Sequence, residues 1–84
     1  MTAAVASEKY ITEFYNTGQT KVEKTYKNGK LNGPFKMYSR DGRIMMQGTM
    51  KDGKKDGDWV VYYFNGEKSL YSSGVFRDGK WVAP

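Results

Sequence analysis

Few side chains in this sequence of 84 residues are suited to catalysis. There is no His and no Cys, which removes the commonest general base, the usual zinc ligands and the Ser-His-Asp and Cys-His catalytic groupings. Paired carboxylates can hydrolyse glycosides. All five aspartates, however, stand beside glycine in turn-forming positions, namely Asp41, Asp52, Asp56, Asp58 and Asp78. We therefore expect no enzymatic activity, no cofactor and no metal site.

Two glycine-lysine segments superficially fit a phosphate-binding loop. They run from Gly48 to Lys54 and from Gly74 to Lys80. Lys55 and Trp81 follow them where a Ser or Thr would hold Mg²⁺, and neither segment stands between a strand and a helix. We exclude nucleotide binding of this kind.

Cations recur around the glycine turns, and the chain carries a formal net charge of +5. The members of this basic edge are Lys27, Lys30, Lys51, Lys54, Lys55, Arg77 and Lys80. In a meander these turns lie at one end of the sheet, so the cations line a track that suits the phosphates of nucleic acid or anionic lipid headgroups. The alternative interpretation is that they serve solubility and edge protection.

The element that carries these residues is a repeat. Gly18, Gly42 and Gly66 recur every 24 residues. The third unit is two residues longer than the others, with the insertion around residues 71–73. Each unit contains Asp-Gly or Asn-Gly steps, which are strong signals for hairpin turns because both residues tolerate positive φ.

The spacing of these turns predicts short antiparallel strands, and no helical period is present. The predicted strands span residues 10–15, 20–27, 34–39, 43–51, 59–64 and 68–77, with a short seventh at 80–83. The fold class is thus all-β: a single antiparallel β-meander sheet of about six strands. Residues 1–8 are predicted to be a mobile tail, and residues 9–84 one domain with units at about 9–32, 33–56 and 57–82.

The repeat resembles the MORN repeat, in a bacterial variant. The segment from Gly48 to Tyr62 carries the pattern, with Gly48, Gly53, Gly57 and Trp59 in place, and the segment 24–38 is a second copy with Lys24 at the first glycine. The resemblance implies an elongated single-layer sheet without catalytic residues. MORN proteins include antitoxin-like proteins, protein scaffolds and proteins linked to lipid headgroups.

Aromatic residues supply the predicted binding surface. Aromatics make up 15% of the chain and are enriched, like Met, in the cores of protein interfaces. The candidate partner-binding residues are Phe35, Tyr38, Trp59, Tyr62, Tyr63 and Phe64. The strand at 59–64 is apolar on both faces, so we expect it to be covered on both sides. The sheet must curl on itself, bind a second copy or bind a partner.

The leading functional hypothesis is a small protein-binding inhibitor, antitoxin-like, that occludes a partner protein. A toxin or a subunit of a nuclease complex is the expected partner, as for a phage or plasmid inhibitor of a host defence nuclease. The alternatives are binding of nucleic acid or anionic lipid by the basic edge, and a structural homodimer. The absence of Cys, of a secretory signal and of a long apolar run favours a cytoplasmic protein without a transmembrane segment. Met1 and the truncated last unit favour a complete chain.

Overall fold

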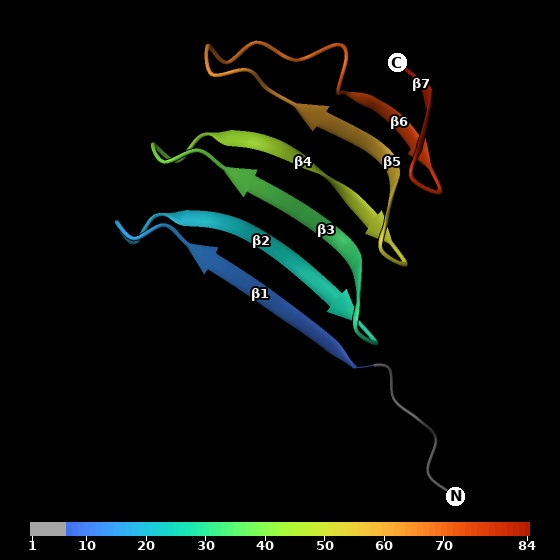
Figure 1. The fold of residues 1–84 in the computed structure, drawn as a ribbon, viewed down its shortest axis with the longest axis horizontal. Coiled ribbons are helices and arrows are strands. Elements are labelled where there is room, and N and C mark those ends of the chain that lie inside the picture. The colour runs from blue at the N-terminus through green and yellow to red at the C-terminus, as the bar shows by residue number, and fades with distance from the viewer. Residues whose placement is uncertain (1–6) are drawn as a thin grey trace, which may run out of the picture.

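The computed structural model describes residues 7–84 as one sheet of seven strands (Figure 1). The strands are β1 (Glu8–Phe14), β2 (Thr20–Lys27), β3 (Lys30–Tyr38), β4 (Ile44–Lys51), β5 (Lys54–Val61), β6 (Gly74–Arg77) and β7 (Lys80–Ala83). They follow one another in sequence order, and each pairs antiparallel with the next. The prediction of an all-β, single antiparallel meander is confirmed, with the seventh strand at residues 80–83. In the described part of the chain there is no helix that could cross a membrane.

The predicted mobile tail falls mostly on residues 1–6, which lie outside the described residues. Its last residue, Glu8, already belongs to β1. Ser7 is tied to the turn between β2 and β3, because its amide N donates to Asn28 Oδ1 at 3.2 Å and its carbonyl accepts from the Asn28 amide at 2.9 Å.

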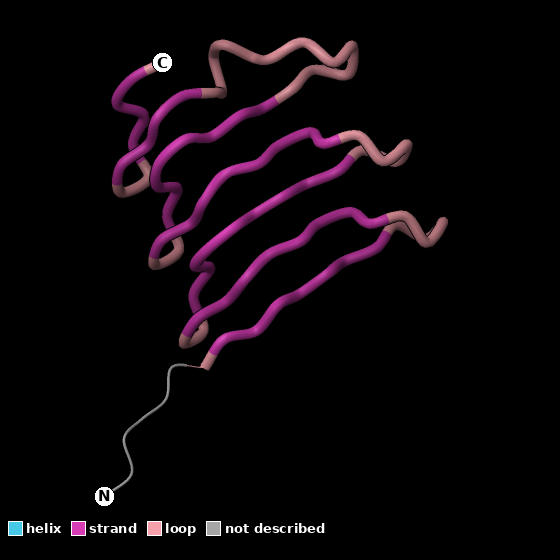
Figure 2. The backbone as a smooth tube through the Cα atoms, turned by 180° about the vertical axis from the view of Figure 1, so that it is seen from behind, coloured by secondary structure: helices cyan, strands magenta, loops and turns pink. Residues whose placement is uncertain are grey.

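The sheet is a single open layer. Its principal extents are 55 × 37 × 11 Å and its radius of gyration is 14.7 Å. A compact protein of this length has a radius of gyration of about 12 Å. Neither face is covered by a second layer of the described chain, so the sheet does not curl into a closed core (Figures 1 and 2).

Two kinds of turn alternate along the meander and gather at opposite ends (Figure 2). At one end, Asn28-Gly29, Asp52-Gly53 and Asp78-Gly79 have positive φ at both residues, the geometry of the two-residue type I′ hairpin. At the other end, the turns around Gly18, Gly42 and Gly66 have positive φ at the glycine only. Their closing hydrogen bonds repeat: Tyr15 with Gln19, Ser39 with Arg43, and Tyr63 with Glu67, each at 2.8 Å.

Strand pairing sorts the side chains into an apolar and a polar face. Residues paired across neighbouring strands share a face. Glu13, Val22, Met37, Met46 and Val61 pair in succession across β1 to β5 on the apolar face. The neighbouring row on the polar face is Thr12, Glu23, Lys36, Gln47 and Val60.

The packing of the apolar face centres on Trp59. Its side chain is 2% exposed and its ring lies over the backbone of Gly48, where an added Cβ would come within 2.2 Å of Trp59 Cδ2. The Phe35 ring packs beside it at a centroid distance of 5.7 Å, and Trp59 Nε1 donates to the Thr49 carbonyl at 2.8 Å. Among the described apolar residues, only Trp59 and Val22 are buried, at 2% and 6% exposure.

The strand limits differ most from the prediction in the third unit. The predicted strand 59–64 is β5, which runs from Lys54 to Val61, and the predicted strand 68–77 is only Gly74–Arg77. Between them, a single bridge joins Tyr62 and Lys68. The two extra residues of this unit break the pairing that the other units keep. Because the sheet is a single open layer and Tyr63 and Phe64 are exposed, the expectation that residues 59–64 are covered on both sides is wrong.

Candidate functional site

The segment 62–73, here called the aromatic loop, connects β5 to β6 and carries the largest exposed apolar side chains near one another in sequence. Tyr63 is 49% exposed, Phe64 79%, Leu70 78% and Tyr71 94%. Large apolar side chains on an exposed loop are unfavourable in water and mark interaction sites when they cluster. The loop protrudes as the longest connection of the sheet (Figures 1 and 2).

Two buried serines hold the base of the aromatic loop. Ser69 and Ser73 are 3% and 2% exposed. The Val61 amide donates to Ser73 Oγ at 2.9 Å, and the Ser69 amide donates to the Val61 carbonyl at 2.7 Å. The Ser73 amide in turn donates to the Ser69 carbonyl at 3.0 Å. These bonds fix the loop's base, so its exposed apolar side chains are presented from an ordered frame.

A groove of about 300 Å³ lies beside the loop. It is lined by Arg43, Ile44, Met45, Gln47, Tyr62, Tyr63 and Gly66. The Tyr62 amide donates to the Met45 carbonyl at 2.8 Å, which holds this part of the loop against β4. The groove thus joins two aromatic rings, aliphatic and thioether side chains and one cation, a combination suited to protein contacts.

The remaining predicted partner-binding residues are less available. Trp59 is buried over Gly48, so the expectation that it offers surplus apolar surface is wrong. Phe35 is half-buried against Trp59. Tyr38 is half-buried and its hydroxyl donates to the Glu23 carboxylate. Of the six predicted partner-binding residues, the three that lie in the loop are therefore Tyr62, Tyr63 and Phe64.

Cations surround this end of the sheet. The Arg40 guanidinium lies 4.9 Å from the centroid of the Tyr15 ring. Arg43 Nε bonds Asp41 Oδ2 at 3.0 Å. Hydrogen bonds from Ser39 and then from Arg43 lower the pKa of the Asp41 carboxyl from its ordinary value.

The opposite end of the sheet carries the basic row, one cation at the turn end of each strand from β2 to β7. The pairing registers place Lys27 opposite Lys30, Lys51 opposite Lys54, and Arg77 opposite Lys80. Like charges placed directly across a strand pair are destabilising. None of these six cations forms a salt bridge with another described residue.

Lys55, the seventh predicted member of the basic edge, lies elsewhere. Its ammonium is 5.0 Å from the Trp59 ring and 4.9 Å from the Phe76 ring. It covers the apolar face, where a cation over aromatic rings is favourable. The grouping of Lys55 with the turn cations is therefore wrong.

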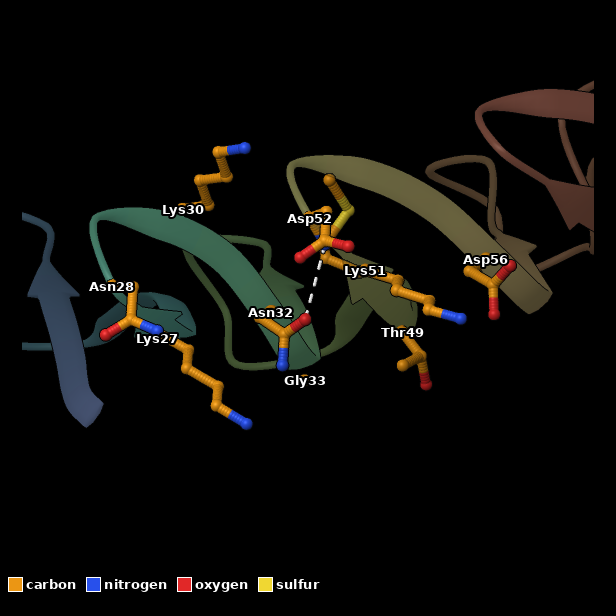
Figure 3. A pocket seen from close by; sticks show the side chains of 10 residues that line it. Lys27, Asn28, Lys30, Asn32, Gly33, Thr49, Lys51, Asp52 and Asp56 are labelled. Atoms are coloured by element: carbon orange, nitrogen blue, oxygen red, sulfur yellow. Dashed lines mark hydrogen bonds between the residues drawn. The ribbon is translucent and has the colours of Figure 1, made fainter. Parts of the chain in front are cut away.

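A groove of about 660 Å³ opens within the basic row, between the turns after β2 and β4. Lys27, Lys30 and Lys51 line it together with Asp52 and Asp56. Figure 3 shows the Lys27 and Lys51 side chains extending away from the Lys30 side chain. Two carboxylates among three ammonium groups leave this groove only weakly positive.

Among residues 7–84 there is no cluster of three His, Cys, Asp or Glu side chains that could hold a metal ion. Tyr10 and Phe14 of β1 and Trp81 and Val82 of β7 are further exposed apolar residues. Sequence reasoning missed Leu70 and Tyr71. The signal that could have found them is the two-residue lengthening of the third unit, because residues inserted into a hairpin leave the ladder.

In comparisons with known proteins, no family model matches this chain and no curated protein matches it. The resemblance to MORN repeats therefore remains a prediction from the repeating residues. The class that the fold defines is an open, single-layer antiparallel meander of hairpin repeats.

Proposed function

We propose that this protein is a non-catalytic protein-binding module that occludes a surface of a partner protein. The observation that carries the proposal is the aromatic loop, where Tyr63, Phe64, Leu70 and Tyr71 stand exposed on a base fixed by buried hydrogen bonds. Rigid aromatic anchors contribute much of the binding energy in protein interfaces, and little entropy is lost when their frame is already ordered.

The chemistry of the partner follows from the surroundings of the loop. Arg43 lines the groove beside the loop and Lys68 belongs to the loop itself. A partner surface with apolar pockets and an acidic rim would be complementary. An inhibitor or antitoxin-like role, with a toxin or nuclease subunit as the target, agrees with the MORN resemblance, and the lack of Cys favours binding in the cytoplasm.

A pull-down from a lysate of the native host tests this proposal. The tagged wild-type protein is compared with Phe64→Ser and Tyr71→Ser variants, and with Val82→Ser as a control at an exposed apolar residue of β7, outside the loop. We expect one protein to be retained at high salt by the wild type and the control, with affinity reduced about tenfold or more by the loop variants. Equal retention by all four proteins would remove the loop as the binding site.

A second candidate function is binding of a polyanion, nucleic acid or anionic lipid, through the basic row. It is favoured by the like-charged pairs across three hairpins, none of which has a counter-ion among the described residues. Binding of single-stranded nucleic acid or of anionic vesicles would then weaken steeply with salt. It would also weaken in Lys27→Gln with Lys51→Gln and not in Lys36→Gln. Binding insensitive to salt, or equal in the two variants, would contradict this candidate.

A further inference from the structure

Strand β1 forms one edge of the sheet, and only one side of it is paired. Among residues 7–84, its sole neighbour is β2. Six of its seven residues are exposed, and only Ile11 is half-buried. It contains no proline, and its pairing with β2 is regular from Glu8 to Glu13. A free edge of this kind presents backbone N–H and C=O groups to any strand of matching register.

We infer that a second copy of this chain pairs with β1 in an antiparallel arrangement centred on Ile11. A two-fold axis perpendicular to the sheet would place Ile11 opposite Ile11, Tyr10 opposite Thr12, Lys9 opposite Glu13, and Glu8 opposite Phe14. All seven residues of the strand are used in this register. The interface is isologous and closes on itself, as most homodimer interfaces do.

Charge complementarity selects this register. Lys9, Ile11 and Glu13 alternate along β1 and lie on the same face, because they pair with Tyr26, Lys24 and Val22 of β2. The two-fold therefore sets each Lys9 ammonium beside the partner copy's Glu13 carboxylate, twice per dimer. Opposite charges directly across a strand pair are stabilising.

The Glu13 carboxylate can bind a second cation in addition to Lys24. Its Oε2 atom lies 2.8 Å from Lys24 Nζ, and its side chain remains half exposed. A carboxylate accepts hydrogen bonds at both oxygens, so Oε1, which has no ion-pair partner within residues 7–84, can accept from Lys9 of the second copy. Lys24, Glu13 and Lys9 would then alternate in sign across the junction.

Neighbouring registers are worse by the same criteria. A shift of one residue puts each apolar face against the other copy's polar face. A shift that centres the pairing on Tyr10 or on Thr12 removes both Lys9–Glu13 pairs and shortens the paired segment. The centred register also sets Tyr10, 78% exposed, across from Thr12, an aromatic and β-branched pair that favours strand association.

The dimer would leave the proposed binding surface free. β1 and the aromatic loop lie towards opposite edges of the sheet (Figure 1). Pairing two copies through β1 would join their apolar faces into one continuous face and present two aromatic loops at the far edges. The inference does not depend on the proposed function, since it uses only the residues of β1 and β2.

Sedimentation velocity from micromolar to millimolar concentration tests the pairing. We expect a monomer–dimer equilibrium for the wild type and for Lys36→Glu, a matched charge change on the polar face of β3. Lys9→Glu should raise the dimer dissociation constant about tenfold or more, because it sets two carboxylates against each other. Mixing Lys9→Glu with Glu13→Lys should restore a heterodimer, since both junctions are then of opposite charge. A wild type that stays monomeric, or a dimer that Lys9→Glu leaves intact, would overturn the inference.

Cross-linking gives a second measurement that does not depend on charge. The chain has no Cys, so a single introduced thiol has only its symmetry mate as a partner. Paired residues have Cα atoms about 4.5–5.5 Å apart, within the range that a disulfide spans. Under mild oxidation Ile11→Cys should form a covalent dimer, while Thr12→Cys, offset from its mate along the strand, should react far more slowly. Equal rates for the two variants would contradict the register.

Discussion

At the scale of single residues, the contact between Trp59 and Gly48 organises the apolar face. The indole ring occupies the space that any side chain at Gly48 would need. We expect Gly48→Ala to lower the free energy of unfolding by about 1–3 kcal/mol, as overpacking does. Chemical denaturation would measure the change, with Thr49→Ala, an exposed neighbour, as the control. An unchanged midpoint for Gly48→Ala would mean that the ring does not lie there.

Tyr38 offers a second residue-level test. Its hydroxyl donates to the Glu23 carboxylate, and this bond, followed by burial, raises the pKa of Tyr38 above 10.0. The protonated tyrosine is the form stabilised by folding, so its contribution is present below the unfolded pKa, near 10, and is lost as pH rises through the folded pKa. Absorbance titration should show one late tyrosine that Tyr38→Phe removes and Glu23→Gln shifts back towards 10.0. A late component that survives both substitutions would belong to another tyrosine.

At the scale of elements, the aromatic loop depends on Ser73. The Ser73 hydroxyl is the acceptor for the Val61 amide at the end of β5. Ser73→Ala would leave that amide without its partner, at a cost of about 1–3 kcal/mol of unfolding free energy. Thermal or urea unfolding would show it, and Ser72→Ala, at an exposed position, should stay within about 0.5 kcal/mol of the wild type. Equal stability of the two variants would show that the loop base does not need this bond.

The turns explain why the register repeats so faithfully. Three Asx-Gly pairs at one end adopt positive φ at both residues, which Asn, Asp and Gly tolerate better than other residues. The second and third of these turns also bond the preceding hairpin: the Gly53 amide donates to the Leu31 carbonyl of β3 at 2.8 Å, and the Gly79 amide donates to the Lys55 carbonyl of β5 at 2.9 Å. The hairpins are therefore locked to one another as well as closed in themselves.

At the scale of the whole molecule, the described chain is a flat, single-layer sheet. Solution scattering of the monomer at low concentration should give a radius of gyration of at least 14.7 Å, because the open sheet has no second layer to make it compact. A value near the 12 Å or so of a compact protein would show that the sheet folds over on itself in solution. With only two buried apolar residues among those described, the sheet depends on pairwise packing between neighbouring strands.

The sequence by itself determined the class of fold, the approximate positions of the strands and the two sets of turns. These features are local: alternation along a strand, and glycine where φ must be positive, act within a few residues of chain. The repeat of 24 residues then carried the same local pattern through three units. It also identified Tyr62, Tyr63 and Phe64 as candidates, which the structure brings together on one loop.

Only the tertiary structure decided which aromatic residues are free. Trp59 and Phe64 stand in the same predicted strand, yet one is buried and the other exposed. The difference comes from a neighbour distant in sequence, since Gly48 leaves room for the Trp59 ring and no strand pairs beside Phe64. In the same way, Lys55 is not part of the basic row, because its ammonium lies over the rings of Trp59 and Phe76. The burial of a side chain and the residues it contacts depend on neighbouring strands, so they are decided only when the strands have been placed side by side.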